Sequence, residues 1–211
     1  MRILVAAFAL SAAIATPIVA AQMQAPGTKS TAAITGGAYT VDANHTFVIW
    51  TVDHLGFTPL SGTFGEITGS LQLDKANPAA TKLDITIPVS KMALPSAGLR
   101  GHLLRPGKDG GKPDFFGDAP ADGKFVSTAV TVKGTDAATL TGNLTLNGVT
   151  KPVTLDVAFY GAGKMPAQMG GKENVGFTAK GTIKRSDYGL GLAVPMVSDE
   201  VKLKVVAAFM K

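Results

Sequence analysis

Three histidines, His45, His54 and His102, are the residues of this chain best suited to acid–base or metal chemistry. His45 and His54 are separated by an odd number of positions, so they face opposite sides of a regular strand. The chain has no cysteine and contains neither a His-x-His nor a His-Glu-x-x-His motif that would support a metal site. Asp53 directly precedes His54, and adjacent strand residues point to opposite faces, which makes them a poor catalytic dyad. The sequence therefore predicts no metal, no cofactor and no general base with an orienting partner.

Motifs for binding phosphate or nucleic acid are also missing. The Gly-Lys pairs at 107–108, 111–112, 163–164 and 171–172 lack the upstream glycine and the following Ser or Thr of a phosphate-binding loop. Lysines and arginines are scattered, without a basic run or interleaved aromatic residues, which argues against nucleic acid as a partner. The formal net charge is +5 at pH 7. This excess favours an anionic head group on a ligand, or transient contact with an anionic membrane surface.

Alternating apolar and polar residues predict that the chain is built of strands. Between positions 82 and 89, for example, every second residue is Leu, Ile or Val. Asn147-Gly148 is a strong signal for a two-residue hairpin turn, and the apolar parity shifts around Gly65, which predicts a bulge or bend. Together these patterns predict eight strands, at 46–54, 63–74, 82–89, 124–133, 140–146, 153–159, 175–184 and 201–209.

Eight half-buried strands in one domain form a sandwich or a closed barrel, and an eight-stranded barrel can enclose one small ligand. The segment 46–54 is apolar on both faces, with Phe47 and Ile49 on one face and Trp50 and Val52 on the other. Either both faces are covered by other elements, or one of them lines a cavity. The residue pattern alone leaves a packed core and a ligand cavity open as alternatives.

The first 21 residues have the pattern of a secretory signal peptide. Arg2 is followed by an apolar stretch from Ile3 to Ala15 and by small residues up to Ala21. A membrane anchor is the alternative, but a spanning helix needs about 20 apolar residues and this stretch is shorter. We therefore expect cleavage after Ala21 and export to the periplasm. Residues 22–37 are expected to be a flexible lead-in to a single domain at 38–211.

One long connection, residues 91–123, interrupts the strand pattern. Connections of this length in a compact domain are usually functional or disordered. Ser96 is placed to cap a short helix that ends near Leu104, and Phe115-Phe116 is an apolar pair in an otherwise polar loop. We expect this segment to be a lid that folds over the barrel opening. Permanent packing of the two phenylalanines at a barrel end is the alternative.

Several short motifs resemble those of the YceI-like family, in the same order along the chain and between Tyr39 and Phe209. They are VDANHT at 41–46, VIWTVDHLG at 48–56, GTF at 62–64, RGHL at 100–103, DFF at 114–116, GNLTLNGVTKPV at 142–153, GF at 176–177 and RSDYG at 185–189. The resemblance implies a lipocalin-like antiparallel barrel, export to the periplasm, and binding of polyisoprenoids or related long apolar amphiphiles inside the barrel. This chain departs from the family pattern in a Pro- and Gly-rich insertion at 106–113 and in Asp53, where a basic residue is common.

The resemblance and the strand pattern together suggest which residues contact such a ligand. For the apolar tail we expect Trp50, Val52, Phe64, Leu103, Phe115, Phe116 and Phe125, and for the head group His54, Arg100, His102 and Arg185. Core packing is the alternative for the phenylalanines, and a hydrogen-bonded structural histidine is the alternative for His54. A salt bridge, for instance between Arg185 and Asp187, is the alternative for the arginines.

The sequence thus predicts an all-β protein whose eight-stranded antiparallel, lipocalin-like barrel carries a polyisoprenoid or fatty-acyl amphiphile in the periplasm. Two alternatives stay open. One is an enzyme acting on such a lipid, for which the sequence offers no nucleophile or paired base. The other is an interaction module with a solid barrel. The oligomeric state is open as well, with a homodimer as one alternative.

Overall fold

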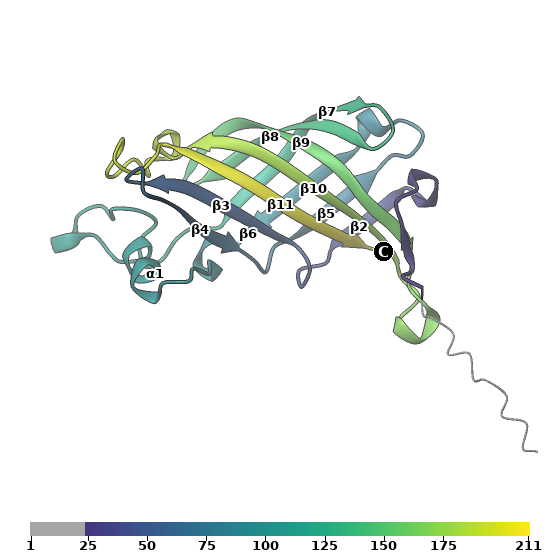
Figure 1. Ribbon diagram of the computed structural model, residues 1–211, viewed down its shortest axis with the longest axis horizontal. Coiled ribbons are helices and arrows are strands. Elements are labelled where there is room, and N and C mark those ends of the chain that lie inside the picture. Colours follow the sequence, from purple (N-terminus) through teal and green to yellow (C-terminus); the bar gives the residue numbers. More distant parts are fainter. Residues whose placement is uncertain (1–23) are drawn as a thin grey trace, which may run out of the picture.

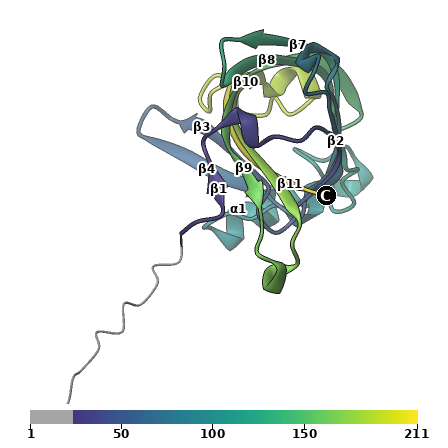
Figure 2. The same ribbon diagram turned by 90° about the vertical axis from the view of Figure 1, so that its right-hand side faces the viewer.

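Eight antiparallel strands close into a barrel in the computed structural model, which describes residues 24–211 (Figures 1 and 2). Each strand of the ring pairs with the next, and β11 pairs with β2 to close it. In ring order the strands are β2 (Gly37–Val41), β5 (Thr68–Leu73), β6 (Lys82–Ile87), β7 (Gly123–Lys133), β8 (Ala137–Leu146), β9 (Val149–Lys164), β10 (Glu173–Lys184) and β11 (Glu200–Met210). The predicted all-β class and eight-stranded antiparallel barrel are confirmed. The signal peptide expected at 1–21 lies outside the described residues.

The barrel wall continues beyond this ring as a hairpin of β3 (Phe47–His54) and β4 (Thr58–Phe64). Near its end β11 pairs with β2, where Phe209 faces Val41. Further back β11 pairs with β3 instead. Along β11, β2 and β3 therefore act as one long partner strand that is interrupted at residues 42–46.

A bend separates β4 from β5. The sequence pattern suggested a single strand at 63–74, whereas β4 ends at Phe64 and β5 begins at Thr68. The bend predicted at Gly65 is confirmed, and the next residue, Glu66, has a φ of 53°. Because the chain turns here, β5 stays in the closed ring while β3 and β4 lie outside it.

The Asn147-Gly148 turn joins β8 to β9 as predicted. The φ angles of these residues are 50° and 78°, which suits the type I′ turn whose twist matches that of the flanking strands. The Asn147 side chain also donates a hydrogen bond of 2.9 Å to the carbonyl of Tyr188. The turn is thereby tied to the connection between β10 and β11.

The long connection at 91–123 contains the expected short helix, α1 (Ala97–Leu103). Ser96 caps its N-terminus, because the Leu99 N–H donates to Ser96 Oγ at 3.2 Å. Figure 1 shows α1 at one end of the barrel. Within residues 24–211, no helix combines the length and the apolar character needed to cross a membrane.

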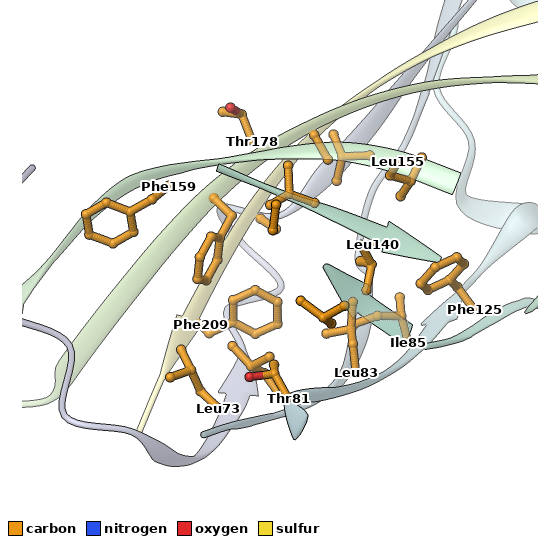
Figure 3. A pocket seen from close by; sticks show the side chains of 18 of the residues that line it. Leu73, Thr81, Leu83, Ile85, Phe125, Leu140, Leu155, Phe159, Thr178 and Phe209 are labelled. Atoms are coloured by element: carbon orange, nitrogen blue, oxygen red, sulfur yellow. The ribbon is translucent and has the colours of Figure 1, made fainter. Parts of the chain in front are cut away.

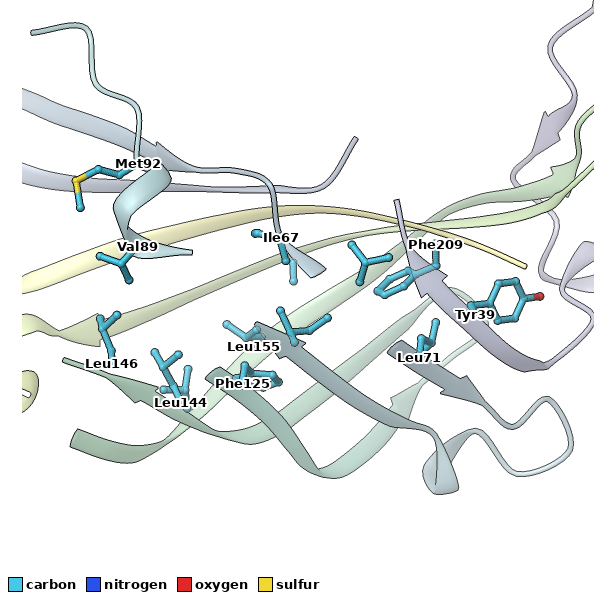
Figure 4. Close-up of a cluster of buried hydrophobic side chains, with 14 of the residues drawn as sticks. Tyr39, Ile67, Leu71, Val89, Met92, Phe125, Leu144, Leu146, Leu155 and Phe209 are labelled. Carbon is cyan, nitrogen blue, oxygen red and sulfur yellow. The ribbon is translucent and has the colours of Figure 1, made fainter. Parts of the chain in front are cut away.

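This end of the barrel is filled by packed side chains, and we call it the closed end. Thr63 of β4 and Ala93 exchange two backbone hydrogen bonds, of 2.8 and 2.9 Å, which fasten the connection to the edge of β4. Val89 and Met92 are fully buried beside them (Figure 4). The connection therefore extends the barrel wall beyond the edge of β4.

The N-terminal lead-in crosses the opposite end of the barrel (Figure 2). It belongs to the segment 22–37, which the sequence predicts to be a flexible lead-in, and its described residues form hydrogen bonds with the barrel. A short strand, β1 (Gly27–Thr28), pairs with the end of β9, and the 3-10 helix η1 (Thr31–Ala33) follows it. Ile34 packs against the core. We call residues 29–36 the strap, and the barrel end that they cross the mouth.

Inward-facing apolar residues alternate with outward-facing polar ones along each ring strand (Figure 4). On β11, for example, Leu203 and Val205 face the interior while Lys202 and Lys204 are exposed. Burying one such aliphatic side chain stabilises the fold by about 1.5–3 kcal/mol. The inward side chains do not fill the barrel, however, and the space that they leave is the candidate site.

Candidate functional site

An elongated cavity of about 620 Å³ runs through the barrel (Figure 3). Its volume falls within the range of about 300–1,000 Å³ that is usual for pockets holding small organic molecules. Every ring strand from β5 to β11 contributes inward-facing side chains to its wall. The cavity therefore follows from the alternation of strand residues around a closed ring, and not from a local motif.

The wall of the cavity is almost entirely hydrocarbon. Its central part is lined by Leu71, Leu83, Ile85, Phe125, Leu140, Leu144, Leu155, Val157, Val205 and Phe209. Among the described residues that line it, only Lys75 and Asp136 are ionisable, and both lie in turns at the mouth. Such a wall can bury an apolar chain, and apart from Lys75 and Asp136 its polar side chains are threonines.

The cavity opens at the mouth and extends along the barrel as far as Phe64, Ile87 and Leu146, beneath the packed side chains of the closed end. Its rim is formed by the β5–β6 turn with Lys75, by the β7–β8 turn at 134–136, and by the strap residues Thr31, Ala32 and Ile34. Figure 2 shows the strap crossing this opening. A molecule entering or leaving by the mouth must pass beside the strap or displace it.

Two sets of polar contacts hold the strap in place. On one side, the Lys75 ammonium donates to the Ala32 carbonyl at 3.1 Å. On the other side, Thr35 donates to a Glu173 carboxylate oxygen at 2.5 Å, and Lys211 forms an ion pair of 2.8 Å with the same oxygen. We call Thr35, Glu173 and Lys211 the Glu173 cluster. Hydrogen bonds from Lys211 and Thr35 lower the pKa of Glu173, and Glu173 in turn raises the pKa of Lys211.

Two of the residues predicted from the sequence, Phe64 and Phe125, line the cavity. Trp50 and Val52 lie on the same face of β3 as the lining residue Val48, but closer to the closed end. The Trp50 ring lies against Gly62, so closely that a Cβ atom at this position would lie only 2.3 Å from the ring. Trp50 therefore packs against the backbone of β4 and does not line the cavity.

The expected lid residues are at the closed end. The Phe116 ring packs edge-on against Phe64 at a centroid distance of 6.4 Å, and the Phe116 N–H donates to the Leu103 carbonyl at 3.1 Å. Phe115 packs in the same manner against His102, at 5.3 Å. The 91–123 connection thus covers the end of the barrel opposite the mouth. The segment that covers the mouth is the strap.

Arg100, His102 and His54 also lie outside the cavity. The Arg100 guanidinium donates to the carbonyls of Met92 and Ser90, at 2.9 and 2.8 Å, and so holds the 91–123 connection together. His102 Nε2 is 3.6 Å from an Asp114 carboxylate oxygen. His54 ends β3 and forms a backbone bridge with Val197 of the β10–β11 connection. None of the three lines the cavity.

Arg185 is buried, with 7% of its surface exposed, and it does not line the cavity. Its guanidinium donates to the carbonyls of Ser198 at 2.9 Å, Val197 at 2.8 Å and Leu192 at 2.8 Å, and also to that of Leu190. Desolvation lowers the pKa of Arg185. The guanidinium is thus engaged by carbonyls of its own β10–β11 connection, and these take the place of the salt bridge that the sequence offered as an alternative.

Sequence reasoning missed most of the wall and all of the mouth. The inward positions of the strands, such as Leu140 and Val205, are visible as alternating apolar residues, but the sequence does not say which of them border a space. Lys75 and the strap carry no local signal, because their role depends on which end of the barrel is open.

Replacing Arg185 by Met should destabilise the protein strongly. The substitution leaves several buried carbonyls without a donor, and each such loss costs about 1–3 kcal/mol. We expect a fall of several kcal/mol in the free energy of unfolding, measured by urea denaturation. Arg105→Met is the matched control, since Arg105 pairs with Asp114 at the surface, and solvent-exposed pairs contribute little to stability. Normal stability of Arg185→Met together with loss of bound ligand would instead assign Arg185 to the head group.

Acid should loosen the strap. The folded state lowers the pKa of Glu173. The stabilising contribution of the Glu173 carboxylate to the folded state is therefore fully present above the ordinary pKa of 4.5, and it is lost as the pH falls through the lowered value. We expect hydrogen-exchange protection factors at 29–36 to decrease in that range. Glu173→Gln should show the decrease already at neutral pH, whereas Glu66→Gln, which removes a surface pair with Lys91, should not. Equal strap protection in Glu173→Gln and the wild type would contradict a fastening role for the cluster.

Known proteins are similar to this chain in sequence and in fold. The YceI-like domain model matches residues 39–209. Protein YceI of Salmonella arizonae is 36% identical over 177 residues, which cover 82% of this chain and 87% of that protein. The crystal structure of Burkholderia cenocepacia BcnA superposes with a TM-score of 0.64 at 26% identity and covers 80% of this chain and 98% of that one.

A more distant structure has the same architecture. A polyisoprenoid binding domain from Saccharophagus degradans superposes with a TM-score of 0.53 and covers 81% of this chain and 97% of that one. At 13% identity this likeness shows the fold alone. The family match, by contrast, extends over nearly all the described residues and includes the strands that line the cavity. On that evidence the chain belongs to the YceI-like domain family.

Proposed function

We propose that this protein is a carrier that holds the tail of a long apolar amphiphile, of the polyisoprenoid or fatty-acyl type, in its barrel. The single observation that carries the proposal is the hydrocarbon-lined cavity of about 620 Å³ that opens at the mouth. Burial of apolar surface provides the driving force, about 25 cal/mol per Å². The force is non-directional, which suits a flexible chain without polar groups.

The polar rim supports an amphiphile and not a plain hydrocarbon. Lys75 and Asp136 lie at the mouth beside the hydroxyl groups of Thr31, Thr81 and Thr135. A tail in the cavity therefore leaves its head group among polar side chains and water. The motif resemblance supports a polyisoprenoid tail, and one domain of the same fold is described as polyisoprenoid-binding.

A carrier role fits the cavity better than the two alternatives do. An enzyme needs an acid or base aligned with a reacting atom, and the described wall has ionisable groups only at the mouth. A solid interaction module has no use for an internal space of this size. We propose further that the carrier works in the periplasm, which rests on the signal-peptide pattern of residues 1–21.

A carboxylate placed in the cavity should abolish lipid retention. Val205 lies in the wall, and in Val205→Asp an unpaired charge opposes the burial of a tail. We expect native mass spectrometry with lipid extraction to find an amphiphile in the purified wild type, and at least about tenfold less in the variant.

The matched control is Val126→Asp, the same change on the exposed side of β7. This variant should keep the wild-type lipid content, and circular dichroism should show that both variants are folded. A folded Val205→Asp with unchanged lipid content would overturn the proposed site. A wild type that carries no lipid and binds no fatty-acyl probe would overturn the proposed function.

Export predicts a processed N-terminus. If residues 1–21 direct secretion, N-terminal sequencing of protein recovered from a periplasmic extract should begin near Gln22. The same residues fused to a reporter should carry it out of the cytoplasm. Recovery of the protein in the membrane fraction with Met1 in place would favour the anchor alternative.

A further inference from the structure

The hairpin between β9 and β10 projects from the mouth end of the barrel (Figure 1). We call residues 165–172, which include the 3-10 helix η5 (Ala167–Met169), the hairpin tip. Met169 in the tip has 57% of its surface exposed, and Tyr160 on the adjoining part of β9 has 68% exposed. Large apolar side chains are thus held in solvent next to the opening of an apolar cavity.

Lysines flank these apolar side chains. We call the base of the hairpin, at residues 164–165 and 172–173, the neck. Lys164 lies on one side of it and Lys172 on the other, and the Met165 N–H donates to the Lys172 carbonyl at 2.9 Å. Neither lysine forms a salt bridge within residues 24–211. Glu173, the acidic residue on the neck, is already paired with Lys211. The neck therefore has a net positive charge.

A third lysine extends the same surface. Lys29 is exposed and directly follows Thr28 of β1, which pairs with Ala162 of β9, two residues before Lys164. The positive charge thus continues from the hairpin onto the strap. Positive charge, exposed apolar side chains and the mouth of the cavity occur together at this end of the molecule.

The closed end also exposes apolar side chains, but without this charge. Phe57, 85% exposed, and Met196, 66% exposed, lie on two connections joined by a hydrogen bond of 2.9 Å from the Leu55 N–H to the Met196 carbonyl. The segments 51–65 and 186–199 contain no lysine or arginine. This cluster lies away from the mouth, and it provides a matched comparison for the hairpin tip.

We propose that the hairpin tip and its lysines, Lys164, Lys172 and Lys29, dock the mouth of the barrel onto an anionic lipid bilayer. Lysines attract anionic head groups, and an exposed Tyr suits the boundary between water and the apolar layer. Met169 enters that boundary while the lysines contact the head groups. The proposal rests on the carrier function, because docking at the mouth lets a tail pass between bilayer and cavity with little exposure to water.

A bilayer fits this surface better than a protein partner does. Stable protein interfaces bury about 1,200–2,000 Å² in total, whereas the hairpin tip is one short turn of chain around the 3-10 helix η5. Gly170 and Gly171, with φ of 95° and 62°, form the tight return that leaves Met169 at the apex. A few projecting side chains with flanking lysines match a fluid surface, which adapts to them.

The test is co-sedimentation of the full chain with vesicles made of equal parts of phosphatidylcholine and phosphatidylglycerol. The wild type should bind these vesicles, bind pure phosphatidylcholine vesicles much less, and lose binding as salt is raised. Lys164→Glu combined with Lys172→Glu should weaken binding at least about tenfold, and Met169→Asp should also weaken it. Phe57→Ser, at the closed end, should bind as the wild type does.

The same variants separate docking from carriage. Binding of a fluorescent fatty acid from aqueous solution should be unchanged in the tip variants, since the cavity is untouched, while its transfer from mixed vesicles should slow. Failure of the wild type to bind the fatty acid would count against the carrier function alone. Wild-type vesicle binding by the tip variants, loss of binding in Phe57→Ser only, or no vesicle binding by the wild type would each overturn the docking proposal.

Discussion

The structure depends on the pairing of β11 with β10 on one side and with β2 and β3 on the other. This pairing closes the sheet, and a closed sheet has an inside. Once the ring is closed, the strict alternation of strand residues sends one apolar row of each strand into the interior. The ring of eight strands encloses more space than these side chains fill, and the remaining space is the cavity. The candidate site is therefore a consequence of closure and not an addition to the fold.

The two ends of the barrel are held by different kinds of contact. At the closed end, Arg185 makes buried hydrogen bonds to main-chain carbonyls, and Phe116 packs on Phe64. Breaking such contacts leaves buried polar groups or voids and is costly. At the mouth, the strap is held by exposed polar contacts of Lys75 and the Glu173 cluster, which water can replace. We therefore expect local opening to start at the mouth.

A cavity of this kind requires none of the catalytic and nucleotide-binding motifs that are missing from the sequence. Motifs mark sites where a few polar atoms need exact positions, such as a phosphate-binding loop. Burial of a hydrocarbon chain needs only area and volume, which any set of aliphatic side chains provides. In the proposed function, the charged side chains available to distinguish one head group from another lie at the rim, at Lys75 and Asp136. The hairpin tip adds charge and apolar surface to the same end.

Local patterns in the sequence were enough to predict most of the strands, the Asn147-Gly148 turn and the helix capped by Ser96. Each of these depends on residues a few positions apart, and the eight-stranded barrel followed from their number together with the family resemblance. The membership of the ring did not follow: β2 was not predicted, and β3, which was predicted, lies outside the closed ring.

The roles of particular side chains also required the tertiary structure. Arg185 could be a head-group ligand or a structural residue until the carbonyls of a returning connection were placed around it. The 91–123 connection was the expected lid, and only the tertiary structure shows that the strap is the segment that crosses the mouth of the cavity. Hydrogen-bond partners and openings are set by contacts between segments far apart in the chain, whereas residue periodicity reports only on the local conformation and on which face is apolar.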